Sequence, residues 1–177
     1  MTLTMKFDNL KSALEKYRDL VIKDAKQELA RQKKKNTGGL YDKIIGQEVK
    51  IYPNSLDFNI EMPYYATFVD KGVSGTEKKY NTPYKYTDKM PPTRVFDKWI
   101  IKKGIAPRTG GGHFRSRDSI KFRIAKTIYK RGIKPSLFFT KPFQKYFKDV
   151  PQEITDAFGL DVANFMSFII KQNFKTK

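Results

Sequence analysis

The chain has 177 residues, no cysteine and one histidine, and its 36 Lys and Arg against 18 Asp and Glu give a formal net charge of +18 at pH 7. The missing cysteines exclude a disulfide scaffold, thiol catalysis and a Cys-ligated zinc, and a single histidine excludes a His-rich metal site. The length is typical of one domain, and a hydrophobic content of 39%, with 14% aromatic residues, is enough for a folded core.

The sequence contains no apolar run approaching the roughly 20 residues of a membrane span. Residues 1–6 also lack the apolar stretch of a signal peptide. We therefore expect a soluble protein that is made in a reducing cytoplasm and has no membrane partner. Because so large a positive charge is self-repelling, an anionic neighbour is expected, and nucleic acid is the obvious candidate.

Residues 7–35 are predicted to form one long helix, because apolar residues recur along it at steps of three and four. The stripe consists of Phe7, Leu10, Leu14, Tyr17, Val21, Ala25 and Leu29. Asp8 or Asn9 is expected to cap its start, and the Asn-Thr-Gly-Gly stretch at 36–39 is expected to end it.

The hydrophobic period then changes to two, which predicts an antiparallel β-hairpin with strands at 49–52 and 56–62. Residues 53–55 form its turn. The face that is expected to lie against the first helix carries Val49, Ile51, Leu56, Phe58, Ile60 and Met62. For the aromatic-rich segment 64–72, a short helical turn or a strand is expected.

Residues 73–115 are predicted to form a basic, loop-rich insertion, because prolines and a Gly-Gly-Gly run interrupt any regular pattern. One short helix is embedded in it, between Pro92 and Gly104. Its apolar face is expected to consist of Val95, Phe96, Trp99 and Ile100.

A further helix is predicted over 117–131, with Ser116 as its N-cap and Gly132 as its end. An extended linker at 135–140 leads to helices over 142–158, where Pro151 is expected to break or kink the chain, and over 161–172, which Gly159 separates from the first. The buried residues of the last helix are expected to be Val162, Phe165, Phe168 and Ile169. Together these elements predict a single α+β domain over 1–177, with a long N-terminal helix on a small antiparallel sheet.

A search for catalytic chemistry in the sequence finds no convincing site. His113 lies in a Gly-Gly-Gly-His loop that resembles a phosphate cradle, but no GxxxxGK[ST] pattern is present, and a flexible basic loop is the better interpretation. Asp70 has no second carboxylate at a spacing that forces a pair, so a turn-capping role is favoured over acid–base or metal chemistry. We therefore expect no enzyme, no cofactor and no metal.

Positive charge is concentrated in the middle of the chain: residues 73–135 carry +13, whereas residues 36–72 carry −2. Basic residues there alternate with Tyr80, Tyr84, Tyr86 and Trp99, which is one way to contact phosphates and stack on bases. No known nucleic-acid-binding module fits, and a solvated basic face is the simpler interpretation. The candidate contact residues for DNA or for neighbouring subunits are Lys78, Lys79, Lys102, Lys103, Arg108, Arg115 and Arg117.

Two short motifs resemble a family of tailed bacteriophages, the head–tail joining and tail-completion proteins. The first motif consists of Tyr65, Ala66, Phe68, Val69, Asp70 and Gly72, and the second of Ile124, Ala125, Ile128, Gly132, Ile133, Pro135, Phe138 and Phe139. The order of helix, hairpin, first motif, variable middle, helix and second motif is similar as well. The basic 73–115 stretch is longer than the family minimum.

The resemblance implies a non-enzymatic virion protein that forms a ring at the head–tail junction, or neck. Its partners would be copies of itself, the portal or adaptor, and tail proteins, with weak sequence-independent contact to double-stranded DNA in the lumen. Tyr64, Tyr65, Phe68, Phe138 and Phe139 are the candidate packing or interface residues, although the same aromatic residues suit an internal position. Two alternatives remain open: a sequence-independent nucleic-acid-binding protein that uses residues 73–131, and a DNA-acting packaging enzyme built around Asp70.

Overall fold

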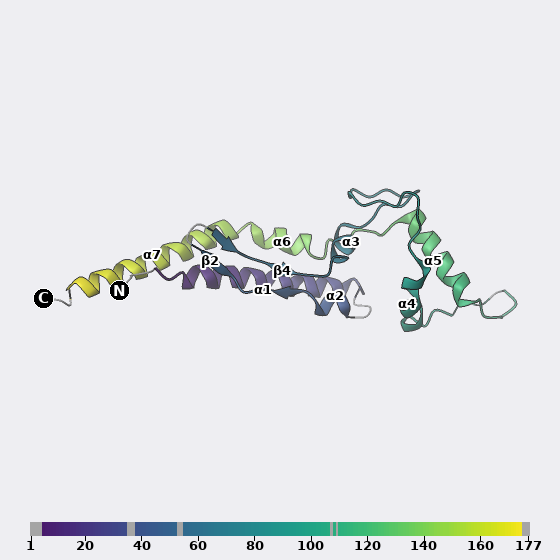
Figure 1. Cartoon of the computed structure of the whole chain (residues 1–177), viewed down its shortest axis with the longest axis horizontal. Helices are drawn as coiled ribbons and strands as arrows, with labels where there is room; N and C mark the ends of the chain where they lie inside the picture. Colours follow the sequence, from purple (N-terminus) through teal and green to yellow (C-terminus); the bar gives the residue numbers. More distant parts are fainter. Residues whose placement is uncertain (1–4, 35–37, 53–54, 107, 109, 175–177) are drawn as a thin grey trace. The chain divides into compact units, whose positions relative to one another are not determined.

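The computed structural model is a mixed α+β structure and describes residues 5–34, 38–52, 55–106, 108 and 110–174 (Figure 1). Contacts between Cα atoms divide the chain into two compact units. Unit 1 comprises 1–27, 44–62 and 139–177, and unit 2 comprises 28–43 and 63–138. Contact units are not by themselves independently folding domains, so the single domain over 1–177 stays a prediction.

The long N-terminal helix is confirmed as α1 (Asp8–Arg31). Its predicted apolar stripe is buried from Leu10 to Leu29, with Val21 and Ala25 fully inaccessible to solvent, whereas Phe7 precedes the helix and is half-buried. Leu10 and Leu14 form one core cluster with Val49, and Tyr17 and Val21 form another with Val150. The amphipathic period of α1 therefore places the core of unit 1 along one side of this helix.

The helix is also shorter than predicted, because the chain leaves it at Lys33, whose φ is +53°. The amide of Lys33 donates to the Ala30 carbonyl and that of Lys34 to the Leu29 carbonyl, which is the pattern of a Schellman C-terminus. The predicted helix stop at 36–39 lies partly outside the described residues, and Gly38, with φ +83°, precedes the one-turn helix α2 (Gly39–Asp42).

The predicted hairpin is present as β2 (Lys50–Tyr52) and β3 (Ser55–Asp57), which pair antiparallel with Ile51 opposite Leu56. The second predicted strand, however, is divided. Its end forms β4 (Ile60–Glu61), which pairs with β1 (Ile45–Gly46), a strand that sequence analysis missed. Part of the predicted turn, 53–54, lies outside the described residues.

The face of the hairpin toward α1 is only partly as predicted. Val49 is buried, and Ile51, Phe58 and Ile60 pack against the core clusters of α1. The prediction that Leu56 is buried is wrong, since this side chain is exposed. Leu56 lies near the tip of this two-stranded ribbon, one pair before its last described pair, Tyr52 with Ser55.

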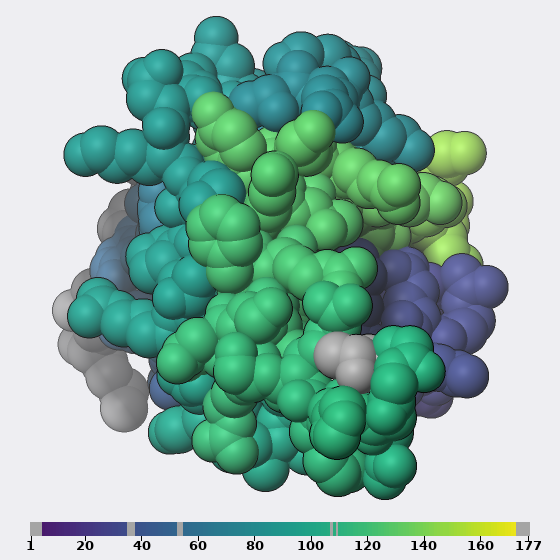
Figure 2. All heavy atoms as spheres, turned by 90° about the vertical axis from the view of Figure 1, so that its right-hand side faces the viewer, coloured from purple at the N-terminus to yellow at the C-terminus, as the bar shows by residue number. Residues whose placement is uncertain are grey.

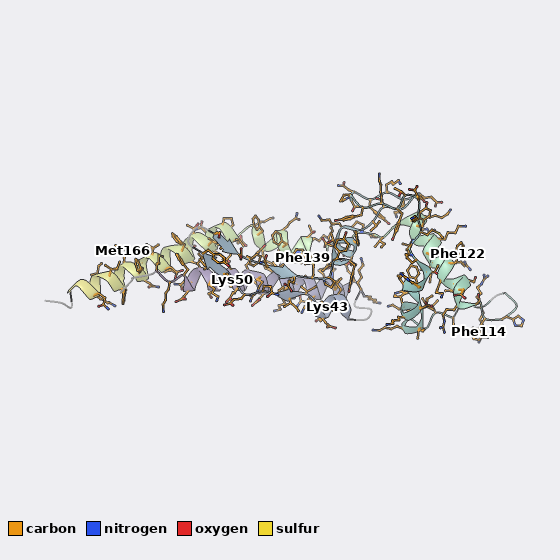
Figure 3. The ribbon with its side chains drawn as sticks, viewed as in Figure 1. Lys43, Lys50, Phe114, Phe122, Phe139 and Met166 are labelled. Carbon is orange, nitrogen blue, oxygen red and sulfur yellow. The ribbon has the colours of Figure 1, made fainter. Side chains whose placement is uncertain are left out.

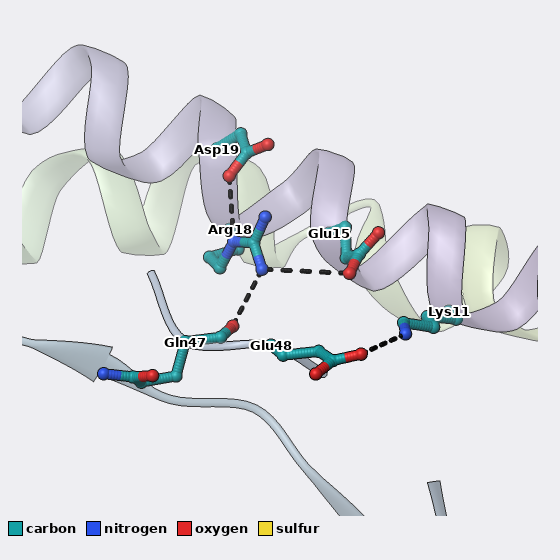
Figure 4. Close-up of polar contacts among 6 residues, drawn as sticks. All are labelled: Lys11, Glu15, Arg18, Asp19, Gln47 and Glu48. Carbon is teal, nitrogen blue, oxygen red and sulfur yellow. Dashed lines mark hydrogen bonds and ion pairs between the residues drawn. The ribbon is translucent and has the colours of Figure 1, made fainter. Parts of the chain in front are cut away.

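Polar contacts fix the segment between β1 and β2 to α1 (Figure 4). Arg18 donates from a guanidinium nitrogen to the Gln47 carbonyl at 2.8 Å and also pairs with Asp19. Lys11 binds Glu48 at 2.7 Å. The Arg18 side chain also lies over Gly46, where an added Cβ would be 2.6 Å from its Nε, so a residue without a side chain suits this position.

The C-terminal part of unit 1 consists of α6 (Thr140–Phe147) and α7 (Val150–Phe174). Phe143 and Tyr146 of α6 pack against the cluster of Tyr17, Val21 and Val150. The expected break near Pro151 corresponds to the boundary between the two helices, since proline is tolerated in the first turn of a helix.

The predicted break at Gly159 is wrong, because α7 continues through this residue without interruption. Burial of Val162 and Phe168 is also wrong, since both side chains are exposed, while Phe165 and Ile169 are partly buried. The reason is geometric: α1 begins at Asp8, and beyond Asp161 no described element of unit 1 runs alongside α7 (Figure 1).

Replacing Gly159 by alanine is expected to stabilise the chain by about 0.5–1 kcal/mol, because glycine in a helix interior has excess conformational entropy to lose. A Cβ at this exposed position would meet no atom within 4 Å. Urea unfolding of the two chains measures the difference. A lower stability of Gly159→Ala would mean that the helix is interrupted here after all.

The buried carboxylate of Asp161 in α7 holds the start of α1. It accepts the backbone amides of Asn9 at 3.1 Å and Leu10 at 2.9 Å, and the Asn9 side-chain amide at 2.8 Å. These are amides of the first turn, which have no partner within their own helix. The expected local cap from Asp8 or Asn9 is therefore supplied from the far end of the sequence instead.

A second polar contact joins α1 to α6. The Asp24 carboxylate accepts from Lys145 Nζ at 2.9 Å and from the Tyr146 hydroxyl at 2.8 Å. The hydrogen bond from Lys145 lowers the pKa of Asp24 below its ordinary value. Hydrogen bonds to Tyr146 and Asp24 in turn raise the pKa of Lys145 to about 12.

We expect Asp24→Asn to weaken the acid sensitivity of the fold. Because the pKa of Asp24 is depressed in the folded chain, its stabilisation is present above the unfolded pKa near 3.8 and is lost as pH falls through the folded pKa. The wild-type chain should therefore lose more stability than Asp24→Asn between neutral pH and pH ~3. Chemical unfolding at both pH values tests this, and equal losses would show that the contact contributes nothing.

Unit 2 is built around α5 (Arg117–Arg131), whose predicted bounds are confirmed. Ser116 caps it by accepting the Ser119 amide, and Gly132 ends it with φ +70°. The 3-10 helix η1 (Thr93–Phe96) and α4 (Asp97–Lys102) form the expected short helix. α5 contacts η1, and Ile100, Ile120 and Ala125 are buried.

Val95 does not share the expected apolar face with Phe96 and Ile100. A 3-10 turn has three residues rather than 3.6, so the predicted helical face is rotated here and Val95 points to solvent while Phe96 is half-buried. The segment 64–72, for which a helical turn or a strand was open, forms the short helix α3 (Ala66–Lys71), which ends at Gly72 with φ +74°.

Candidate functional site

The two sequence motifs, far apart in the chain, meet in unit 2. The backbones of Val73 and Ile133 exchange both hydrogen bonds, at 2.9 and 2.8 Å. Next to them, the amide of Ser136 donates to the carbonyls of Val69 and Asp70, and the amide of Leu137 also donates to Asp70. We call this arrangement, residues 66–75 with 129–138, the clasp.

The clasp is closed by glycines that allow backbone to touch backbone. A Cβ on Gly75 would collide with the Lys130 carbonyl oxygen, and one on Gly132 would collide with the Val73 carbonyl oxygen. The 76–78 turn also lies against the C-terminal end of α5, because the amides of Thr76 and Glu77 donate to the carbonyls of residues 129 and 130. Glycine is therefore required at both positions of closest approach.

Side chains complete the clasp. The Ser136 hydroxyl donates to the Val69 carbonyl at 2.5 Å, and the Ser74 hydroxyl donates to the Tyr80 carbonyl and accepts the Tyr80 amide. Ser74 and Ser136 are both buried, and Phe138 is fully buried. Buried hydroxyls with backbone partners on both sides fix the local geometry.

Unit 2 also carries almost the whole charge of the protein. It contains 23 Lys and Arg against 7 Asp and Glu, a net charge of +16, whereas unit 1 contains 13 against 11, a net charge of +2. Most basic side chains of unit 2 are exposed, and α5 contributes a large part of the face seen in Figure 2. The charge asymmetry expected from the sequence thus belongs to one compact unit.

The predicted basic contact residues are all exposed, but they do not form one site. They are Lys78, Lys79, Lys102, Lys103, Arg108, Arg115 and Arg117. Lys78 and Lys79 lie beside the C-terminal end of α5, because Lys78 N donates to the Lys130 carbonyl, whereas Arg115 and Arg117 lie at its N-terminal end. At 1.5 Å per residue the two groups are about 20 Å apart.

Two of these cations lie over aromatic rings. The Arg108 guanidinium is 4.3 Å from the centre of the Phe114 ring, and Lys78 Nζ is 5.6 Å from the Tyr80 ring. The Phe114 ring itself is largely exposed and lies shortly before α5, where Phe114 forms a β-bridge with Arg108 (Figure 3). These pairs hold charge and aromatic surface together at the periphery of the unit.

A cavity of about 480 Å³ lies beside the clasp. Its walls combine Lys33, Lys34 and Lys103 with the rings of Tyr41, Tyr65 and Trp99 and the apolar side chains of Val69 and Ile133. Burial lowers the pKa of Lys34, and Lys134 lowers it further, while Asp70 opposes the shift. Ammonium groups and rings around one cavity are suited to an anionic group carried on an apolar or aromatic body.

A second cavity, of about 550 Å³, is mostly apolar. It runs along α5 and is lined by Trp99, Ile105, Arg115, Ile120, Arg123, Ile124, Thr127 and Ile128. The predicted apolar row of α5, Ile120, Ile124 and Ile128, therefore lines this cavity, and Ile120 is also buried in the core. Arg115 and Arg123 add positive charge to its lining.

The predicted packing residues divide between surface and core. Tyr64 is 81% exposed and Tyr65 is 47% exposed, and Phe68 lies edge-on to the rings of Tyr64 and Tyr84. Phe138 belongs to the core of unit 2, and Phe139 lies in unit 1 against Phe143. Of this set, only Tyr64 and Tyr65 offer substantial surface for a neighbour.

The described residues show no group of three or more His, Asp or Glu that could hold a metal ion. Asp70 is buried in the clasp, where its carbonyl receives two amides, and His113 is exposed in its loop. Within the same part of the chain, no helix is long and apolar enough to cross a membrane.

Sequence reasoning named Lys103 and Tyr65 as candidate residues but missed Lys33, Lys34 and Tyr41, which line the same cavity beside the clasp. Lys33 and Lys34 were part of the predicted first helix, and Tyr41 belonged to no predicted element. The signal that was available is the run of lysines before the Gly-Gly pair, which is typical of a helix end but does not show what lies opposite. No family model matches the chain, and neither does any curated protein or solved structure.

Proposed function

We propose that this protein is a bacteriophage virion protein that forms an oligomeric ring at the head–tail junction and joins the portal or adaptor to the tail. The observation that carries the proposal is the clasp. The two motifs that resemble the head–tail joining family, around 65–72 and 132–138, bind each other through paired backbone hydrogen bonds and close-approach glycines. The two motifs therefore form one structural element, which is expected if this chain and the head–tail joining family share a fold.

The charge distribution supports the same function. A subunit with +16 on one unit and +2 on the other presents one strongly basic part. In a ring around the DNA passage, such a part would attract double-stranded DNA without reading its sequence, since Lys and Arg bind phosphates. The work of the protein is assembly, and no bond is made or broken.

Electron cryomicroscopy of particles of the phage that encodes the chain tests the proposal. The expected result is a closed ring of copies around the tail axis between portal and tail. Disruption of its gene should leave filled heads and tails unjoined. Purified particles that lack the chain, or that hold it only as isolated subunits, would contradict the proposal.

The charge of unit 2 favours a second candidate, a sequence-independent nucleic-acid-binding protein that uses residues 73–131. A DNA shift assay at increasing salt separates the two. A monomer that binds DNA tightly, with an affinity that falls steeply with salt, would favour this candidate. Weak binding by a chain that associates with portal or tail proteins would favour the ring.

A further inference from the structure

The second half of α7 is the most apolar exposed surface of the described chain. Large hydrophobic side chains are exposed at 17 described positions, and six of them fall within residues 158–170. They are Phe158, Leu160, Val162, Met166, Phe168 and Ile170. The only charged residue in this stretch, Asp161, is turned inward to cap α1.

These six side chains form two rows along the helix. Phe158, Val162, Met166 and Ile170 follow one another at steps of four and make the first row. Leu160 and Phe168 make the second row, and each stands two residues from a member of the first. Since an α-helix turns by about 100° per residue, the two rows lie about 200° apart, on nearly opposite sides of α7.

Much of this surface is exposed among the described residues of unit 1. Phe158 stacks on Phe7 with ring centres 6.1 Å apart, near the start of α1. Beyond that point no described helix or strand of unit 1 runs alongside α7, and the Met166 side chain is exposed (Figure 3). Leu160 is 58% exposed and Met166 is 52% exposed, so the loss of cover affects both rows.

The exposed area is divided between the two rows. Of the roughly 500 Å² that the six side chains present, the first row holds the larger share, so a row-on-row contact would form the apolar centre of an interface to which each partner contributes ~800 Å² in the standard case. Phe165 and Ile169, which are partly exposed, extend the patch.

The chemistry of α7 excludes two other occupants. A helix that lies on a membrane surface carries Lys and Arg on its polar side, whereas Lys171 is the only basic residue of α7, against Glu153, Asp156 and Asp161. The same deficit of positive charge disfavours nucleic acid. A protein surface of the same apolar kind is the remaining match.

We propose that residues 158–170 of α7 are a subunit–subunit contact, in which the first row of one copy packs on the second row of the next copy. A helix with apolar rows on opposite sides can contact a neighbour on each side, so association does not stop at two copies. Contacts of this head-to-tail kind close into rings. The inference rests on the proposed function only in treating the neighbours as members of a ring.

The test is the mass of the full chain in solution, measured by light scattering and sedimentation at high micromolar concentration and moderate salt. The wild-type chain should form species larger than dimers. Met166→Glu damages the first row and Leu160→Glu the second, so each variant alone should be a monomer. Gln144→Glu adds the same charge at an exposed position of α6, outside both rows, and should associate like the wild type.

Mixing the two row variants gives the decisive measurement. Leu160→Glu keeps an intact first row and Met166→Glu an intact second row, so an equimolar mixture should form dimers of one copy of each. Met166→Ser and Leu160→Ser remove apolar surface without adding charge. Each should weaken association, though less than the glutamate variant at the same position does. Unfolding curves check that every variant is folded.

Three results would overturn the proposal. They are a monomeric wild-type chain, a Leu160→Glu variant that still forms dimers, and a mixture that remains monomeric. None of these would decide the neck function itself, because the presence of a ring in particles is established separately by microscopy. Conversely, solution assemblies that depend on both rows would support this contact even if the ring were located elsewhere in the virion.

Discussion

Gly132→Ala is expected to destabilise unit 2 by more than about 3 kcal/mol, which would disrupt the clasp. Gly132 adopts φ +70°, and a Cβ there would collide with the Val73 carbonyl oxygen and lie 2.6 Å from the Gly75 amide nitrogen. Both obstacles are hydrogen-bonded backbone atoms, since the Val73 carbonyl accepts the Ile133 amide and the Gly75 amide donates to the Lys78 carbonyl. Hydrogen exchange of the Val73 and Ile133 amides, together with urea unfolding, measures the effect.

Gly104→Ala is the matched control for this variant. Gly104 also has a positive φ, +60°, but a Cβ there would meet no atom within 4 Å. It should therefore cost only the backbone strain of an L-residue, about 1 kcal/mol, and leave exchange in the clasp unchanged. Equal effects of the two variants would show that the clasp is not tightly closed at Gly132.

The elements that sequence reasoning predicted correctly are those with local determinants. α5 has a serine cap, an apolar row and a glycine end within its own sequence, and its bounds are confirmed. The apolar stripe of α1 spans many turns, so the sequence alone predicts which side of this helix is buried. The hairpin likewise follows from strict alternation around its turn.

The errors arise where the outcome depends on a distant partner. Whether Val162 and Phe168 are buried depends on where α1 begins, and apolar periodicity in α7 carries no information about that. β1 has only two residues and pairs with β4 across the hairpin, so no local pattern could reveal it. Gly159 resembled a break because glycine is a poor helix former, but α7 continues through it between the buried Ala157 and Asp161, whose carboxylate binds the start of α1.

The candidate site was predictable in charge but not in arrangement. The excess of Lys and Arg in 73–135 is visible in the sequence and belongs to unit 2. That these cations occupy opposite ends of α5, and that Lys34 faces aromatic rings in a cavity, depends on chain crossings such as Val73 with Ile133. Such crossings are set by tertiary packing, for which one sequence without relatives gives little information.

Asp161→Ala is expected to lower the stability of unit 1 by about 2–3 kcal/mol, because it leaves two first-turn amides of α1 without their acceptor in a buried place. The carboxylate receives the amides of Asn9 and Leu10 and the side chain of Asn9, and its charge lies at the positive end of the α1 dipole. Asp161→Asn keeps one acceptor oxygen but loses the charge, so a loss of about 1 kcal/mol is expected.

Asp156→Ala is the control that separates capping from the removal of a negative charge on α7. Asp156 is exposed and accepts a hydrogen bond from the Gln152 side chain at 2.8 Å, so its removal should change the stability by less than about 0.5 kcal/mol. Hydrogen exchange of the Asn9 and Leu10 amides should quicken in Asp161→Ala and not in Asp156→Ala. If the two variants lost equal stability, Asp161 would act through general charge, and the start of α1 would depend on contacts such as Phe7 on Phe158 instead.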